Sequence, residues 1–200
     1  MKLRGFAGGE YVLWDAFENK AVRRHSGDGS INLTVAPNNL LVLFTNTGFI
    51  ANDGKLICES DAVGEELKNE WKIELCCEKE LPDYRTYKTV SELRSISAPD
   101  EMPGFTGNMR YTAKVQLDPE KHKMLDLGAV GQTAEVRLNG KYVGTRLFAP
   151  YRFDISEYVK AGENLLEITV ANTCVYEQSD KFSRYMLIKP SGLLGPVTVR

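Results

Sequence analysis

The chain has 200 residues, with 25 basic and 27 acidic side chains and a formal net charge of -2. A chain of this length buries roughly 70% of the surface that it exposes when unfolded. Its hydrophobic content of 42% is ordinary for a globular protein and argues against intrinsic disorder. Because no basic block or acidic tail stands out, neither nucleic acid nor an anionic membrane is an expected partner.

The N-terminal sequence MKLRGFAGGEYVLW has a basic start but no apolar h-region, so a secretory signal peptide is not expected. The longest apolar run, from Leu40 to Phe44, is too short to cross a bilayer. We therefore expect a soluble protein of a reducing, cytoplasmic compartment, unless the sequence is a fragment that has lost its own targeting signal.

The four cysteines are Cys58, Cys76, Cys77 and Cys174. Cys76 and Cys77 are adjacent, so on a strand they would point to opposite faces. The sequence has neither a CxxC spacing nor a Cys/His cluster, which argues against a structural zinc site. We expect plain buried or half-buried thiols and no cofactor.

The first fifty residues show period-two patterns separated by turn residues. Tyr11 and Leu13 precede the turn-rich sequence DAFENK, and Ile31, Leu33 and Val35 alternate with polar residues. The run from Leu40 to Phe44 predicts a short strand buried on both faces. These patterns predict a small β region over residues 1–50.

A polar connection runs from about residue 52 to residue 69, and alternation resumes at Trp71. Trp71, Ile73, Leu75 and Cys77 are expected on one face of this strand. We expect Trp71, like Trp14, to pack in a core. Residues 80–108 are rich in proline and charge and predict a long loop, with one or two helical turns between Thr89 and Ile96.

The second half contains several short alternating segments at regular spacing, which is typical of a sandwich or barrel. Asn139-Gly140 predicts a hairpin with a type I′ turn, because this pair tolerates positive φ angles. Ser156 is a candidate N-cap for one helical turn through Val159. The apolar positions expected to face inward are Val136, Leu138, Phe153, Ile168 and Val170.

Residues 125–173 resemble the sugar-binding β-sandwich of family 2 glycoside hydrolases and their relatives. The resemblance is carried by Arg137-Leu138-Asn139-Gly140, by Pro150-Tyr151-Arg152-Phe153-Asp154-Ile155-Ser156 and by Ala161-Gly162-Glu163-Asn164-Leu165, in this order. It implies an all-β fold, a galactose-binding-like jelly-roll sandwich over residues 51–200 that includes the loop at 80–108.

The flanks are similar to the C-terminal region of family 106 α-L-rhamnosidase-like hydrolases. They are FTGNMRY at residues 105–111, with Thr106 where the family has serine, and PSGLLGPV at residues 190–197. Residues 1–50 then resemble the end of a preceding hydrolase β domain. In such enzymes the catalytic carboxylates lie on a separate barrel, and some relatives carry a structural calcium ion.

Glycoside hydrolysis requires two facing carboxylates. Glu65-Glu66, Asp100-Glu101 and Glu177 are candidates, but a chain rich in acidic residues offers such pairs by chance. His25 and His122, the only histidines, lie in turn-like sequences and are expected to be solvated at the surface. We therefore expect that this chain alone is not an enzyme.

Sugar binding needs aromatic faces and polar groups that reach hydroxyls. The resemblance places Asn139 near the sugar, because an asparagine at the matching turn of family 2 relatives approaches it. Arg152 alternatively pairs with Asp154 or with another nearby acid. The candidate carbohydrate-binding residues are Asn139, Arg146, Tyr151, Arg152, Asn172 and Tyr176.

Three functional hypotheses remain. The first is a non-catalytic accessory domain that packs on, or completes, the catalytic domain of a parent hydrolase. The second is a free-standing carbohydrate-binding module, and the third is a small glycosidase. The fold alone does not decide among them, because function depends on the site rather than on the fold. The resemblance implies as partners a carbohydrate or glycan and the catalytic domain of the parent enzyme.

Overall fold

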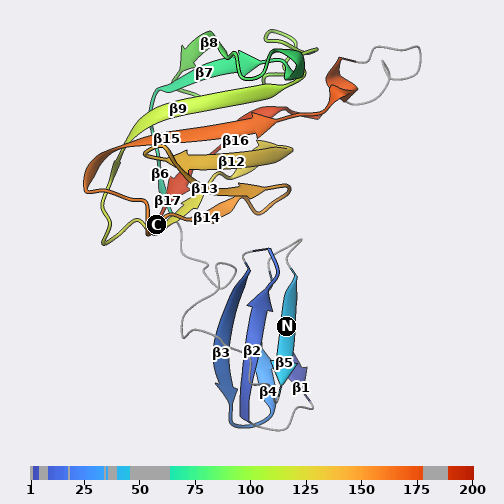
Figure 1. Cartoon of the computed structure of the whole chain (residues 1–200), viewed down its shortest axis with the longest axis vertical. Coiled ribbons are helices and arrows are strands. Elements are labelled where there is room, and N and C mark those ends of the chain that lie inside the picture. Colours follow the sequence, from blue (N-terminus) through green and yellow to red (C-terminus); the bar gives the residue numbers. More distant parts are fainter. Residues whose placement is uncertain are drawn as a thin grey trace. The chain divides into compact units, whose positions relative to one another are not determined.

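A computed structural model describes residues 2–4, 9–17, 19–33, 35, 40–45, 64–177 and 189–200 (Figure 1). The chain divides into two compact units, Met1–Ala62 and Val63–Arg200, later than the boundary expected after residue 50. The described residues contain no helix that is long and apolar enough to cross a membrane. The predicted all-β class is confirmed, since the described helical elements are short 3-10 turns.

The first unit is a small antiparallel β region. Strand β2 pairs with both β3 and β5, while β1 pairs with β4. A small core contains Leu13, Val22, Ile31 and Leu33. The strands are β1 (Lys2–Arg4), β2 (Gly9–Asp15), β3 (Lys20–Ser26), β4 (Ser30–Asn32) and β5 (Leu41–Thr45).

Three expectations for this unit are wrong. Strand β5 is half-buried on both faces rather than fully buried, because this small unit offers few elements to cover it. Trp14 is also only half-buried, and its Nε1 donates a hydrogen bond of 3.4 Å to Oδ1 of Asn19. Val35, expected to continue the apolar alternation, is exposed.

The second unit is built around a six-stranded antiparallel sheet. Its longest ladder joins β9 and β15, ten residues each, in continuous register. The strands, in spatial order, are β13 (Lys141–Arg146), β12 (Thr133–Leu138), β15 (Gly162–Ala171), β9 (Asn108–Leu117), β7 (Trp71–Cys76) and β8 (Arg85–Val90).

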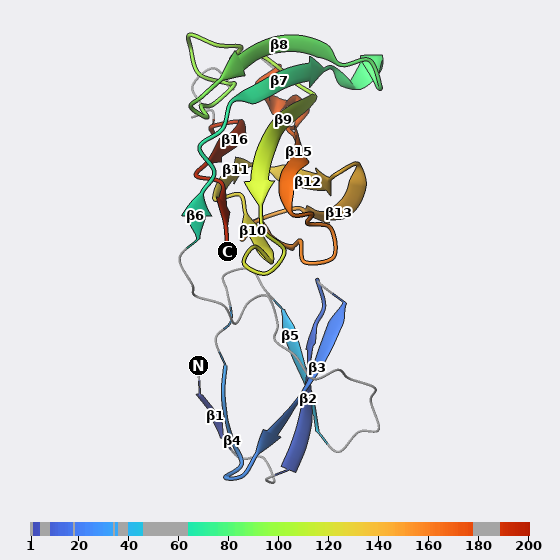
Figure 2. The same cartoon turned by 90° about the vertical axis from the view of Figure 1, so that its left-hand side faces the viewer.

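Two smaller sheets complete the second unit (Figure 2). One core cluster joins Val136 and Ile168 of the large sheet to Leu125, Phe153 and Val199 of the four-stranded sheet, so the sheets form a sandwich. The four-stranded sheet contains β14 (Arg152–Asp154), β10 (Met124–Asp126), β17 (Thr198–Val199) and β6 (Glu65–Glu66), and the two-stranded sheet contains β11 (Ala129–Gly131) and β16 (Gly192–Gly195).

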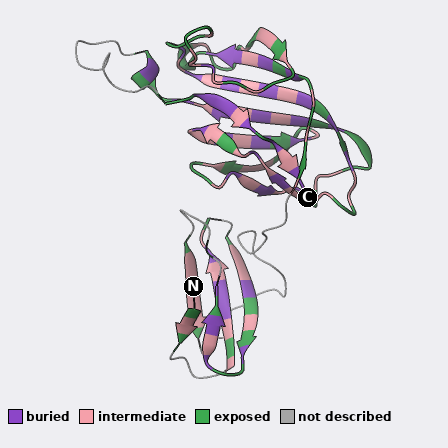
Figure 3. Ribbon diagram, turned by 180° about the vertical axis from the view of Figure 1, so that it is seen from behind, coloured by how far each residue is buried: buried purple, intermediate pink, exposed green. Residues whose placement is uncertain are grey.

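The period-two pattern explains which side chains form the core. Figure 3 shows buried residues alternating with half-buried or exposed ones along the long strands. The five positions that the sequence placed inside are each at most 1% exposed, which confirms the prediction: Val136, Leu138, Phe153, Ile168 and Val170. The turn at Asn139 and Gly140 is also confirmed, with φ angles of 55° and 77°.

The segment after β7 differs from the prediction. Residues 80–108 are not one loop, because they contain strand β8, which pairs along β7 and removes the helical turns expected from Thr89. Cys77, expected inside, leaves the strand and is exposed, whereas Cys76 is buried although it belongs to the outer face. A short 3-10 turn, η2 (Glu78–Glu80), follows Cys77.

Two local expectations are also corrected. The Ser156 side chain does not cap the turn, because the backbone N–H groups of Tyr158 and Val159 both donate to the carbonyl of Ile155. The backbone N–H of Ser156 itself donates to Oδ1 of Asp154 at 3.1 Å. His122 is not solvated, because its side chain is 14% exposed and its Nδ1 accepts a hydrogen bond from the backbone of Asp118.

Candidate functional site

The six predicted sugar-binding residues do not form one cluster. The register of the large sheet places four of them toward the end where β9 and β12 begin, here called the loop end. Asn139 lies at the opposite end of β12, and Arg152 belongs to β14 in the other layer. The four residues toward the loop end are Arg146, Tyr151, Asn172 and Tyr176.

Asn139 holds its hairpin to the neighbouring turn. Its Nδ2 donates to the carbonyl of Tyr158 at 3.0 Å and to Oδ1 of Asn164 at 2.8 Å. Its Oδ1 accepts from the backbone N–H of Leu165 at 3.1 Å. Because both amide hydrogens are already used, a sugar approaching Asn139 would find only spare acceptor capacity at Oδ1.

Three of the candidates are buried and serve internal contacts. The hydroxyl of Tyr151 donates to the carbonyl of Gln132, and burial raises the pKa of this phenol. The Asn172 amide joins three segments: it accepts from Gly107 N–H at 2.8 Å and donates to the Phe105 carbonyl and to Ser191 Oγ. The hydroxyl of Tyr176, in the 3-10 turn η3 (Cys174–Tyr176), donates to the carbonyl of Lys189 at 3.1 Å.

The two arginines are also engaged. The Arg146 guanidinium lies 5.0 Å from the ring centre of Phe153, and its Nη1 donates to the Thr145 carbonyl. Arg152 pairs with Asp126 across β10 and β14, with Nε 2.7 Å from Oδ2. The acid expected to pair with Arg152 is therefore Asp126, which faces it in the ladder, and not Asp154.

The loop end carries a cleft of about 800 Å³, a size typical of ligand sites. Three separate segments build it: Cys77 to Lys79, Glu101 to Thr106, and the turn η3 with the residue after it. Its wall combines the apolar side chains of Met102, Pro103 and Phe105 with carboxylates and thiols, which come from Glu78, Glu101, Glu177, Cys77 and Cys174.

Glu101 lies between this cleft and a second hollow of about 310 Å³ that borders β8. Its side chain is only 7% exposed and accepts hydrogen bonds from Lys88 Nζ and, at 2.7 Å, from the hydroxyl of Tyr87. These bonds, led by the one from Lys88, hold the pKa of Glu101 below its usual range. The same contact to Glu101 raises the pKa of Tyr87 to about 12.

The other candidate carboxylates are held in different ways. Asp100 accepts from Nη2 of Arg94 at 3.0 Å, and this bond keeps the pKa of Asp100 low. Glu65 and Glu66 are exposed on β6, the edge strand of the four-stranded sheet, while Glu177 lines the cleft. Carboxylates held ionised by cations are poor proton donors, because a general acid needs a raised pKa.

The described residues contain no group of three or more His, Cys, Asp or Glu side chains arranged to hold a metal ion. Cys76, Cys77 and Cys174 are free thiols. Cys58 lies outside the described residues. The sequence did not predict the cleft, because the three segments that build it are far apart in the chain. The length of the loop expected at residues 80–108, which supplies the middle segment, was the only feature of the sequence that indicated a functional site there.

Comparisons with known proteins agree with this fold. The family model described as "Glycosyl hydrolase 2 galactose-binding domain-like" matches residues 104–190. This part of the chain is therefore similar to the galactose-binding-like domain of glycosyl hydrolase 2 enzymes. It includes β9, β12 and β15 of the large sheet and the hairpin at Asn139.

Two relatives extend the match. A protein of Formosa agariphila named "Putative beta-glucuronidase" is 43% identical over 88 residues, which is 40% of this chain and 8% of that protein. The structure of a rhamnosidase from Novosphingobium sp. PP1Y superposes with a TM-score of 0.76 and 25% identity, covering 99% of this chain and 21% of that enzyme. The resemblance to rhamnosidase-type hydrolases is confirmed, and the chain spans about a fifth or less of the relatives' length.

Proposed function

We propose that this chain is a non-catalytic, carbohydrate-binding-type accessory region of a glycoside hydrolase of the α-L-rhamnosidase type. It would pack on, or complete, a catalytic domain that lies elsewhere in the parent enzyme.

The observation that carries the proposal is the extent of the match to the rhamnosidase. Nearly the whole chain superposes on that enzyme, yet it accounts for only 21% of the enzyme's length. A region that recurs as a minor part of a large hydrolase is expected to support the enzyme rather than to replace it.

The loop end offers a surface suited to packing on another domain. Several large apolar side chains are exposed in the loops at this end of the sheet, where another domain could cover them. They are Leu81, Met102, Leu147, Phe148 and Val175, between 37% and 66% exposed.

The acidic residues support a non-catalytic role. Asp100 and Glu101, the adjacent pair in the long loop, both have lowered pKa values because Arg94 and Lys88 hold them ionised. Neither is suited to protonate a leaving group at neutral pH. This argues against the third hypothesis, a small glycosidase.

The proposal is tested by assaying the purified chain with aryl α-L-rhamnosides and aryl β-D-glucuronides, and by sequencing the reading frame around its gene segment. We expect no hydrolysis and a catalytic domain in the same or a neighbouring reading frame. Turnover by the chain, abolished by one carboxylate substitution, would overturn the proposal. Glycan binding with no catalytic domain nearby would instead establish a free-standing module.

A further inference from the structure

The outer face of the six-stranded sheet carries two polar rows in register across five strands. On β7, β9, β15 and β12 these residues point away from the core, since the residues on either side of each are buried. On β13, Tyr142 lies on the same face, because its ring centre is 5.7 Å from the outward-pointing Arg137 guanidinium. We call this surface the platform. The first row is Glu74, Arg110, Thr169, Glu135 and Thr145, and the second is Lys72, Thr112, Glu167, Arg137 and Tyr142.

Most charges on the platform are neutralised within it. Glu74 accepts from Lys72 Nζ at 2.8 Å and pairs with Arg110 Nη2 at 2.8 Å. Arg137 Nε pairs with Glu135 Oε1 at 2.9 Å.

Glu167 is different. It lies between Thr112 and Arg137 in the second row and is half-buried, and its side-chain carboxylate makes no hydrogen bond or ion pair with any residue that the structure describes. Its carboxylate therefore retains acceptor capacity at the centre of the platform.

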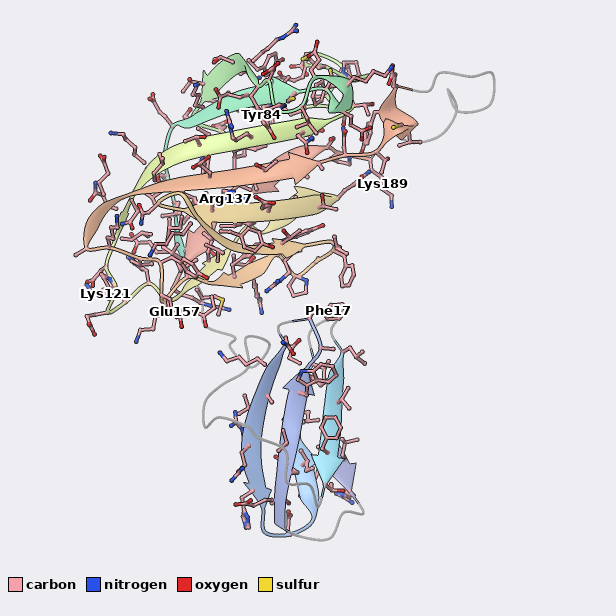
Figure 4. All side chains as sticks on the ribbon, viewed as in Figure 1. Phe17, Tyr84, Lys121, Arg137, Glu157 and Lys189 are labelled. Carbon is pink, nitrogen blue, oxygen red and sulfur yellow. The ribbon has the colours of Figure 1, made fainter. Side chains whose placement is uncertain are left out.

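Two tyrosines lie on this face, one toward each side. The Tyr84 ring lies 4.0 Å from the Arg110 guanidinium. Figure 4 shows Tyr84 on the same face of the sheet as Arg137. Tyr142 is 50% exposed, and its hydroxyl is 3.0 Å from Thr145 Oγ1. The strands that carry Arg110 and Tyr142 are three steps apart, or about 14 Å at the usual spacing between strands.

We infer that the platform binds a neutral oligosaccharide, with Tyr142 and Tyr84 contacting sugar faces and Glu167 and Arg137 contacting hydroxyls. This inference rests on the proposed carbohydrate-related function and gives it a surface. Sugars present C–H faces to aromatic rings, and their hydroxyls both donate and accept, which suits an open carboxylate beside a guanidinium.

The composition of the platform favours this ligand over other partners. Three cations, Lys72, Arg110 and Arg137, balance three carboxylates, Glu74, Glu135 and Glu167, so a polyanion gains no net attraction. The core of a protein interface is depleted in charged residues, whereas the rows contain one large exposed apolar side chain, Tyr142.

The test uses the 200-residue chain on an array of neutral oligosaccharides that contain rhamnose, galactose or glucose. The best binder is then titrated by calorimetry against wild type, Glu167→Gln and Tyr142→Ala. We expect each variant to weaken binding about tenfold, because each removes a charge-assisted hydrogen bond or an aromatic contact.

Two control variants match these changes off the platform. Phe17→Ala removes an aromatic side chain that is also 50% exposed, and Glu157→Gln makes the same change at an exposed carboxylate; both variants should bind like wild type. Retained affinity in Glu167→Gln and Tyr142→Ala, with loss in a cleft variant such as Met102→Ala, would overturn the inference and leave the carbohydrate-binding proposal standing. The absence of any binder on the array would also overturn it, while the accessory role is judged separately by the activity assay and the gene context.

Discussion

The side-chain amide of Asn139 donates a hydrogen bond of 2.8 Å to Oδ1 of Asn164, which is 1% exposed. Asn164 in turn donates to the carbonyls of Lys160 and Gly162. This relationship joins two turns that are distant in sequence and gives Asn139 a structural role, whether or not it also contacts a sugar.

Replacing Asn139 with alanine should lower the free energy of unfolding by about 2 kcal/mol, because a half-buried hydrogen-bond network loses a member and alanine disfavours the positive φ at this position. Urea denaturation measures the change. Asn139→Gly keeps the turn geometry without the side chain, so its smaller loss isolates the hydrogen bonds. An unchanged midpoint in both variants would show that this network does not stabilise the fold.

Asn172→Ala should be more destabilising, by about 3 kcal/mol, since it leaves buried partners on Gly107, Phe105 and Ser191 unpaired. Thermal unfolding followed by circular dichroism reports the loss. Thr173→Ala, the exposed neighbouring residue, is the matched control and should change the melting temperature little. Equal melting temperatures for the two variants would contradict the prediction.

The fold should lose stability in acid through Glu101. The pKa of Glu101 is lowered in the folded protein from the usual 4.5, so its contribution is fully present above that value and disappears as the pH falls through the lower folded value. Denaturation at a series of pH values below about 5 should show this dependence, and Glu101→Gln should flatten it. A variant with the same pH profile as wild type would disprove the assignment.

Gly192→Ala should destabilise the sandwich by about 3 kcal/mol. Gly192 has a φ of 96°, and an added Cβ would lie 2.4 Å from the hydroxyl oxygen of Tyr111. Gly104→Ala is the control, since its φ is not positive and the nearest atom would lie 3.8 Å away. Denaturant titration of both variants tests the prediction, which fails if they unfold alike.

The sequence predicted what depends on local period and turn chemistry. Alternation placed Val136 and Ile168 in the core, and Asn139-Gly140 identified the hairpin. It could not predict which distant groups would meet. Tyr151 and Asn172 were proposed as sugar ligands, yet long-range pairing gives them partners inside the protein. Their roles in sugar binding remain predictions.

Strand β8 shows why a composition rich in charge and proline was misinterpreted. Its residues, RTYKTV, carry little apolar signal, because an edge strand covers the core only partly. The partner strand β7 provides the pairing that organises it, and the expected loop is correspondingly shorter.

The ladder between β9 and β15 has a consequence for biosynthesis. During synthesis, one edge of β9 can pair early with β7, which precedes it in the chain. The other edge has no partner until β15, residues 162–171, has left the ribosome. Until then a ten-residue strand with a row of unsatisfied amides is open to wrong pairing. Folding dominated by such distant contacts is slow, so the nascent protein should depend on chaperone protection during this interval.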